Sequence, residues 1–420
     1  MKYLFLFICF CCGLQVIAQK DSTIKIDLSL EFRPRSEYRD GFKQLPTDSS
    51  AAAFFVSNRS RLNFSIKKQG FQFHTSLQDV RVWGQFGQNS TNGSLSVFEI
   101  YGTQRLSNNW KVKLGRQGVE LDNGRLFSQA NWSQESKAHD GINLIFNSKN
   151  LNSELMGFFN QSGENTFGTD YNLAKTNYKT LNIHYLEAKL SKSFTIMTMN
   201  AFDGYQSVSN SNTLYVRGTS GGRITYKNKI IEATTSSFYQ YGQLQSGQEI
   251  ASYYINPEVA INTKKIEARL GCEIVSGDDA KNPSTVSNSF QTLYGVAFKF
   301  MGHLNYFTQF PKDTKGAGLV NPYLFFAYDL NEKLQIRSDF HLFAIQNNFI
   351  VNNELINKYL GFEQDLKMKF KLNDFTSIDA GFSYMIAEKS MEYLKGGSIK
   401  YTPVWGFIMI TYKPKILSSK

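Results

Sequence analysis

The chain has 420 residues, of which 41% are hydrophobic and 15% aromatic, and its formal net charge is +11. The longest apolar run, residues 3–14, is too short for a membrane-spanning helix, so the sequence excludes helical membrane proteins. The composition does not shift along the chain and no linker interrupts it, which predicts a single domain over residues 19–420.

The first eighteen residues have the pattern of a secretory signal peptide. A short basic start, Met1-Lys2, precedes the apolar run, and the small residue Ala18 precedes the expected cleavage site. Three of the four cysteines lie in this segment, so the mature chain keeps only Cys272 and no internal disulfide is possible. Loss of Lys2 lowers the net charge from +11 to +10. We therefore expect an exported protein.

Alternation of apolar and polar residues recurs along the mature chain. In residues 57–66, Leu62, Phe64 and Ile66 fall on one face and polar residues fall on the other. Residues 334–342 and 360–370 repeat this pattern. A period of two with one apolar face predicts β-strands that have one face in an apolar medium and one in water.

Short and long polar connections alternate between the expected strands. The short turns fall at residues 67–70, 107–109, 147–150, 191–193, 227–229, 262–264, 331–333 and 372–374. The long loops fall near residues 40–53, 84–94, 116–138, 161–178, 206–212, 242–249, 277–318, 347–356 and 388–402. This rhythm predicts an all-β fold: a transmembrane antiparallel up-and-down β-barrel of about eighteen strands, from about Ile24–Arg39 to about Pro403–Tyr412. The short turns would be periplasmic and the long loops extracellular.

Two alternatives to this architecture follow from the same pattern. A soluble sandwich, solenoid or propeller would explain the alternation, but not the rhythm of short and long connections or the length of the strands. Within the longest loop, residues 290–310 are apolar enough to be structured, either as a plug or as two further strands that would make twenty.

The location of the charge separates two surfaces of the expected barrel. Many lysines cluster at turns and strand ends, which predicts a basic collar at the lipid phosphates. Strand positions that face the lumen mix both signs, and such a lining suits a hydrated, hydroxyl-rich solute. The pore candidates on these positions are Arg59, Arg61, Asp79, Arg81, Glu99, Arg105, Arg337 and Asp339. Cys272 has the lipid-facing parity.

The segment "KLGRQGVELDNGRLFSQANWSQESKAHDGINL" resembles the central motif of the alginate-export family of outer-membrane barrels. The matching positions are Leu114, Gly115, Arg116, Gln117, Arg125, Leu126, Trp132, His139 and Asp140. Residues 37–42 and 271–307 also resemble this family, in forms typical of the Bacteroidetes group. The resemblance implies an eighteen-stranded barrel that passes the polyuronate alginate outward through an arginine-rich constriction, although acids are more frequent on the lumen positions here.

The loop after the expected fifth strand carries the remaining site candidates. Arg116 and Asp140 lie at its two ends and are expected to pair, while an inward-folded loop would present Arg125 to the constriction. The alternative is that these residues only hold the loop in place. Trp132 could stack on a sugar or pack within the loop. The adjacent acids Asp278 and Asp279 could bind calcium, but their spacing matches no calcium loop.

These features predict a passive outer-membrane channel for an anionic or hydroxyl-rich polysaccharide or for smaller solutes, with a general diffusion porin as the alternative. An adhesin is a remote alternative. An enzyme is another, because Ser133, Ser136, His139 and Asp140 are close in sequence, but no Gly-x-Ser-x-Gly elbow is present. The five histidines, at positions 74, 139, 184, 303 and 341, show no metal-ligand spacing. We expect no enzymatic activity, no cofactor and no nucleic-acid partner; the expected partners are outer-membrane lipid and the solute.

Overall fold

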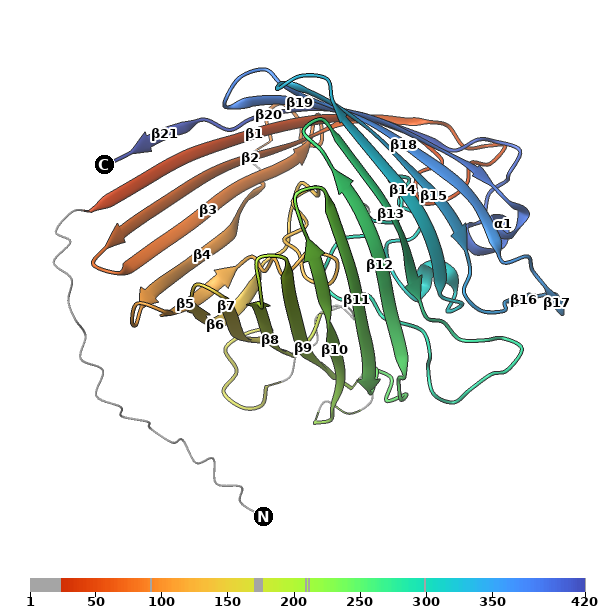
Figure 1. Cartoon of the computed structure of the whole chain (residues 1–420), viewed down its shortest axis with the longest axis horizontal. Coiled ribbons are helices and arrows are strands. Elements are labelled where there is room, and N and C mark those ends of the chain that lie inside the picture. The colour runs from red at the N-terminus through yellow and green to blue at the C-terminus, as the bar shows by residue number, and fades with distance from the viewer. Residues whose placement is uncertain are drawn as a thin grey trace, which may run out of the picture.

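The computed structural model describes residues 24–90, 93–169, 177–207, 210, 212–297 and 300–419. The expected signal peptide, residues 1–18, lies outside the described residues. The described chain forms one closed antiparallel sheet, drawn in Figure 1. Its first nine strands are β1 (Lys25–Asp40), β2 (Ala53–Lys68), β3 (Phe71–Val82), β4 (Leu95–Arg105), β5 (Trp110–Gln117), β6 (His139–Asn147), β7 (Leu151–Phe159), β8 (Thr180–Lys189) and β9 (Phe194–Gln206).

The second half continues in the same order around the barrel. Its strands are β10 (Leu214–Lys227), β11 (Ile231–Gly242), β12 (Ser252–Asn262), β13 (Ile266–Val275), β14 (Leu319–Asp329), β15 (Leu334–Ala344), β18 (Tyr359–Lys371), β19 (Thr376–Ala387), β20 (Val404–Tyr412) and β21 (Lys415–Ser418). β20 and β21 both pair with β1 and are separated only by Lys413 and Pro414. They therefore occupy one position in the ring, and the nineteen strands of the sheet make eighteen barrel positions, as the sequence predicted.

The strands owe their orientation to the alternating pattern. In β14, Asn321, Tyr323 and Phe325 point into the barrel and are buried, whereas Leu324 and Phe326 point outward and are 44% and 42% exposed. Leu270 on β13 is 65% exposed on the same outer surface. An apolar outer surface on a sheet without free edges is the solution that lets strands cross a bilayer, so the barrel belongs in the outer membrane. No described helix is long and apolar enough to cross a membrane.

The connections between strands agree with the predicted rhythm. The eight short turns lie at one rim of the barrel and the nine long loops at the other. Two small elements belong to the long loops: the hairpin β16 (Ile350–Val351) with β17 (Glu354–Leu355), and the helix α1 (Lys389–Lys395). We number the long loops in chain order, so that L1 comprises residues 41–52, L3 residues 118–138 and L7 residues 276–318.

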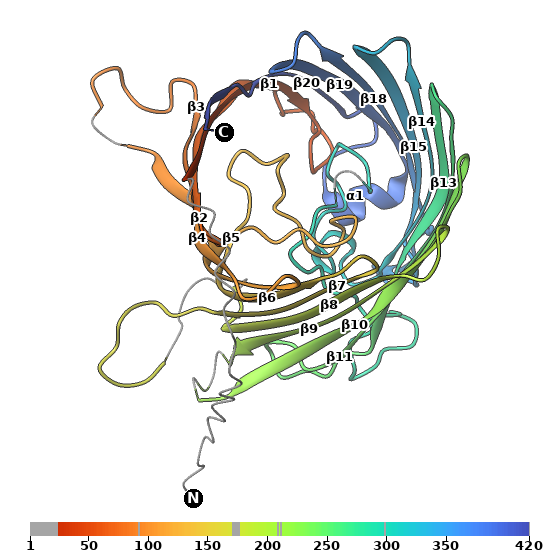
Figure 2. The ribbon, with the colours of Figure 1, turned by 60° about the vertical axis from the view of Figure 1, so that its left-hand side comes forward.

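L3 and L7 fold back into the lumen, and the helix α1 also lies inside the ring of strands, as Figure 2 shows. Around residues 290–310 of L7, the expectation of two further strands is wrong, because the described part of L7 forms only isolated bridges and the short 3-10 helix η1 (Lys312–Thr314). Its apolar side chains pack on the inner wall instead: the rings of Phe307 and Phe343 lie 4.7 Å apart, and Met301 and Leu304 are fully buried. The main apolar core of the protein therefore lies within the barrel, between L3, L7, α1 and the wall.

Candidate functional site

A water-accessible cavity of about 1310 Å³ opens in the half of the lumen that the long loops surround. L3 and L7 form much of its lining, together with residues of the neighbouring loops. Among the described residues that line it, six are basic and one is an acid: Lys43, Arg116, Arg125, Lys137, Arg217 and Lys312, against Asp140. The described lining of the cavity therefore carries a clear excess of basic side chains.

The position of L3 is fixed by arginines on the first two strands. On β1, Arg33 donates from Nη1 to the carbonyl oxygen of Asn131 at 2.6 Å, and Arg35 donates from Nη1 to that of Trp132 at 2.8 Å. On β2, Arg59 donates to the carbonyl oxygen of Ser133 at 3.2 Å. Charge-assisted bonds to backbone carbonyls are stronger than neutral ones, and they satisfy loop groups that would otherwise be buried without partners. The wall of β1 and β2 thus serves as an anchor for L3.

Arg59 and Arg61, two of the predicted pore residues, belong to this anchor. Arg59 is only 2% exposed and pairs with Glu31 on the neighbouring strand. Arg61 is also buried, donates to Gln78 at 2.9 Å, and lies 3.9 Å above the ring of Phe98. The structure places both guanidinium groups beneath L3 and away from the cavity.

Arg125 reaches the opposite wall of the barrel. Its Nε donates to Glu273 Oε1 on β13 at 2.7 Å, and its Nη1 donates to the carbonyl oxygen of Val296 in L7 at 3.2 Å. The Tyr254 hydroxyl donates to the same carboxylate oxygen. Glu273 is fully buried and Arg125 nearly so. The loop folds inward as predicted, but the guanidinium group of Arg125 is used to hold L3, L7 and β13 together.

Arg116 and Asp140 form the predicted pair across the wall. They are direct partners in the register of β5 and β6, and Arg116 Nη1 lies 2.7 Å from Asp140 Oδ2. Their side chains are 38% and 56% exposed and line the cavity. Because water screens this exposed pair, it contributes little to stability.

The other predicted pore residues are spread over the barrel. Arg81 and Asp79 form an exposed bidentate pair at 2.7 Å near the loop after β3. Glu99 accepts a hydrogen bond from the backbone of Gly118 at 2.7 Å, at the start of L3. Arg105 lies at the short-turn rim, in a surface pocket that Lys67, Lys68 and Lys111 also line.

Trp132 packs within the protein. Its ring lies 4.8 Å from Phe407 and 6.0 Å from Trp405, and the Arg35 guanidinium stands 4.4 Å above it. One side of Trp132 still reaches the cavity. The structure therefore gives this residue the loop-packing contacts, which leaves only part of its ring for a solute.

Asp278 and Asp279 brace the backbone of L7. Asp278 accepts hydrogen bonds from the backbone of Asn288 at 2.5 Å and from the Ser289 hydroxyl at 2.7 Å. Asp279 accepts one from the backbone of Lys281 at 2.9 Å. These bonds occupy carboxylate oxygens that a calcium ion would need.

The cluster considered for an enzyme is not assembled as a nucleophile and base. His139 Nδ1 bonds to the Tyr178 hydroxyl at 2.7 Å, and the Ser136 hydroxyl accepts from Arg59 at 3.1 Å. Among the described residues, neither Ser133 nor Ser136 forms a hydrogen bond with the imidazole.

Two groups of basic residues at this site were not predicted from the sequence. Arg33 and Arg35 share the inward parity of β1 with Glu31 and Glu37, so the alternation in "EFRPRSE" was a usable signal. The cavity lysines Lys43 and Lys137 lie in irregular loop segments, and Lys312 begins the one-turn helix η1 within L7, so no periodicity shows which way these side chains point. None of these three lysines forms an ion pair with a carboxylate of the described residues. Arg337 and Asp339 lie elsewhere, in a buried cluster on β15 and β18.

Comparison with known structures supports the architecture. The chain is similar to OccAB1 of Acinetobacter baumannii (TM-score 0.64, 13% identity, 93% of this chain and 97% of that chain). It is also similar to the outer membrane protein OpdK of Pseudomonas aeruginosa, both in one structure (TM-score 0.62, 12% identity, 95% and 100%) and in another with vanillate (TM-score 0.61, 12% identity, 95% and 99%). At these identities the likeness establishes the fold. No family model and no curated protein sequence matches the chain, so the resemblance to the alginate-export family gains no support.

Proposed function

We propose that the protein is a passive outer-membrane channel for small hydrophilic solutes, with a preference for anions. The observation that carries this proposal is the cavity of about 1310 Å³ between L3 and L7, with its excess of basic side chains. A polar lumen narrowed by inward-folded loops selects solutes by size and charge without coupling to an energy source.

Three of the six basic side chains that line the cavity are already paired with carboxylates. Arg125 and Arg217 are neutralised by buried carboxylates, and Arg116 pairs with Asp140. Lys43, Lys137 and Lys312 have exposed side chains that line the cavity, and none of them pairs with a carboxylate of the described residues. Uncompensated charge on low-dielectric walls raises the local concentration of the opposite ion. An anionic solute would therefore be enriched at this level of the lumen.

Two other substrate classes are alternatives to a small anion, and the experiments below distinguish them. General diffusion of small solutes is the alternative with the same fold and needs no charge preference. The sequence resemblance instead implies a polyuronate such as alginate. The structure of OpdK with vanillate supports a small solute as the better working choice, because that protein has the same fold and its structure contains a small molecule.

The experiment is a measurement of reversal potential in planar bilayers under a gradient of KCl. We expect the wild-type channel to favour Cl⁻ over K⁺, and the variant Lys43→Glu/Lys137→Glu/Lys312→Glu to favour K⁺. The matched control is Lys67→Glu/Lys68→Glu/Lys111→Glu, which makes the same charge change at the short-turn rim. A wild-type protein without conductance would overturn the channel. Equal selectivity in all three proteins would leave general diffusion as the function.

Blocking of the current by added solutes separates the substrate classes. Small monovalent carboxylates are expected to reduce the wild-type current at lower concentration than neutral sugars of similar size. If uronate oligomers block at concentrations far below those of the small carboxylates, the polyuronate is the better substrate and the proposal of a small solute is wrong.

A further inference from the structure

Two neighbouring strands carry a dense set of ionisable side chains beneath L7. Residues opposite each other in the register of β15 and β18 include Asp339 with Asp365 and His341 with Glu363. The two aspartates and Glu363 are at most 2% exposed. Like charges directly opposite each other on a sheet are destabilising, and buried carboxylates even more so. The cations next along these two strands, Arg337 and Lys367, are two against three carboxylates, while Lys369 and Lys371 lie further along β18, beyond Lys367.

The bonds around Glu363 leave part of this charge uncompensated. Its Oε1 accepts a hydrogen bond from the backbone of Leu304 at 2.8 Å. Its Oε2 is buried without a hydrogen-bond partner among the described residues. Arg337 is engaged with Asp339, since its Nε lies 2.6 Å from Asp339 Oδ1. A buried carboxylate oxygen of this kind calls for a cation or a proton.

The tautomer of His341 can be read from its neighbours. The amide nitrogen of Asn321 donates to the carbonyl oxygen of Phe300 at 3.0 Å, which turns Asn321 Oδ1 toward His341 Nδ1 at 3.1 Å. His341 Nδ1 therefore carries the hydrogen, and in the neutral ring Nε2 presents a lone pair. That nitrogen lies 3.7 Å from Asp365 Oδ2. Asp365 also accepts hydrogen bonds of 3.3 Å from the backbone N–H of His303. A proton or a metal cation between the imidazole nitrogen and the carboxylate would stabilise this close approach.

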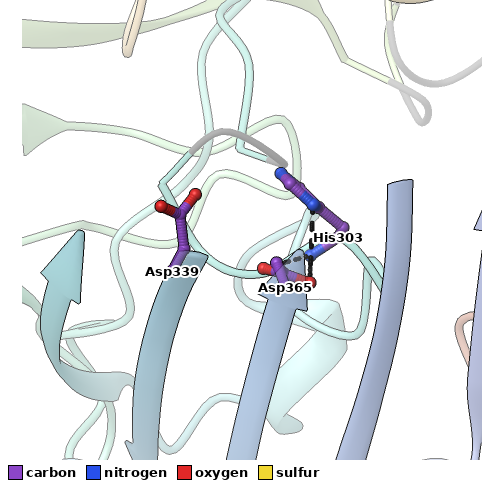
Figure 3. Close-up of side chains that lie close together, drawn as sticks. All are labelled: His303, Asp339 and Asp365. Carbon is purple, nitrogen blue, oxygen red and sulfur yellow. Dashed lines mark hydrogen bonds and ion pairs between the residues drawn. The ribbon is translucent and has the colours of Figure 1, made fainter. Parts of the chain in front are cut away.

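L7 brings a second imidazole to the same carboxylate. His303 Nδ1 lies 3.4 Å from Asp365 Oδ1, and the side chains of His303, Asp339 and Asp365 lie close together in Figure 3. One ligand atom from each of the three lies within 4.8 Å of the others. Around a tetrahedral zinc ion with bonds of about 2.0–2.1 Å, neighbouring ligand atoms stand about 3.3 Å apart. The 3.4 Å between His303 Nδ1 and Asp365 Oδ1 matches this spacing, whereas Asp339 is placed only within 4.8 Å of both and would have to move inward on binding.

We propose that His303, Asp339 and Asp365 bind a divalent transition-metal cation of the zinc type, with His341 Nε2 as the fourth candidate ligand. Imidazole nitrogen combined with carboxylate oxygen favours zinc over calcium or magnesium, which take oxygen ligands. The hydrogen bond from His341 to Asn321 is the kind of outer contact that orients a ligating histidine. The cation would join L7 to β15 and β18, so this metal would fix the loop that narrows the lumen.

The test uses the full barrel in detergent, stripped with a chelator and titrated with Co²⁺. Visible absorption reports inner-shell nitrogen and oxygen ligands. The Trp405 ring, centred 6.1 Å from the ring of His303, reports the same event by fluorescence quenching. We expect saturation at one Co²⁺ per chain and displacement by Zn²⁺. Metal analysis of protein loaded with Zn²⁺ and then dialysed should give the same ratio.

Variants locate the site and separate binding from folding. Asp365→Asn and His303→Gln should each weaken Co²⁺ binding at least 100-fold, whereas His184→Gln on β8 should bind as wild type does. The gel mobility of unheated samples shows whether each barrel is folded. If Asp365→Asn does not fold, His303→Gln decides, because His303 lies in a loop. The absence of Co²⁺ absorption in the wild type, or equal affinity in wild type and His303→Gln, would overturn the metal site and leave a shared proton to compensate the carboxylates.

Discussion

Substitution of Arg125 by Met should release L3 from its docked position without unfolding the barrel. Met keeps much of the length of the side chain but removes the charge and the donors that reach Glu273 and Val296. Glu273 then remains fully buried, with the Tyr254 hydroxyl as its remaining side-chain donor among the described residues. The strand pairs of the wall do not involve the Arg125 side chain, so the barrel should persist.

The magnitude follows from the burial of the pair. Removal of one partner from a buried, hydrogen-bonded ion pair costs about 3–5 kcal/mol, because the other charge is left uncompensated. If this free-energy cost destabilises only the docked position of L3, the ratio of released to docked loop rises by a factor of about 10² to 10³·⁵. The exposed pair of Arg116 with Asp140 provides the matched control, since such pairs contribute about 0–1 kcal/mol.

Limited trypsin digestion measures the population of released loop, because cleavage after Lys137 requires L3 to leave the wall. We expect Arg125→Met to be cleaved at least 100-fold faster than wild type and Arg116→Met less than tenfold faster. Single-channel recordings of Arg125→Met should also show greater current noise. The double variant Arg125→Met/Glu273→Met should recover part of the protection, because it leaves no buried charge. Equal cleavage rates for the two single variants would refute the assigned role of the buried pair.

Three further outcomes are expected. Desolvation by the surrounding loops lowers the pKa of Lys137, although its side chain still reaches the cavity, so its positive charge is lost at a lower pH than that of an ordinary lysine. Anion selectivity measured by reversal potential should fall as the pH rises through that range, and Lys137→Gln should abolish this step. Trp132→Ala should weaken L3 docking by about 3 kcal/mol, the lower end of the range for such a change because the ring is only partly buried, since three close contacts of the ring are lost. The same cleavage assay measures this loss. Cys272, which lies on the same outward face of β13 as Leu270, should react in vesicles with a lipid-soluble maleimide but not with a charged one, and equal reaction with both would place it in water.

The sequence was most informative along the strands, where the alternation of apolar and polar residues follows directly from contact with lipid on one face and the lumen on the other. Residues 57–66 alternate because one face of the strand touches lipid and the other faces the lumen, and this requirement recurs in every strand. The positions of the turns follow from the same pattern. The pairing of Arg116 with Asp140 could also be predicted, since both residues flank one loop on adjacent strands.

Inside the lumen, the alternation of residues does not predict the contacts of the side chains, because the inward-folded loops pack on the wall without a repeating arrangement. Arg59 and Arg61 have the parity of pore residues, yet L3 covers them. Arg125 finds Glu273, which lies 148 residues away in the chain. No local signal could have predicted such a contact, since it depends on how an irregular loop settles on a distant wall.

The sequence by itself determined the barrel, its number of strand positions and the grouping of its long loops at one rim, because lipid and water impose a period of two on each strand independently. Only the tertiary structure decided which inward-facing charges meet the solute, which ones hold L3, and which ones gather around Asp365. Closure of the ring brings β1, β13 and β18 within reach of the loops that fold inward. The role of an inward-facing charge therefore depends on side chains that are distant in the sequence and close in space.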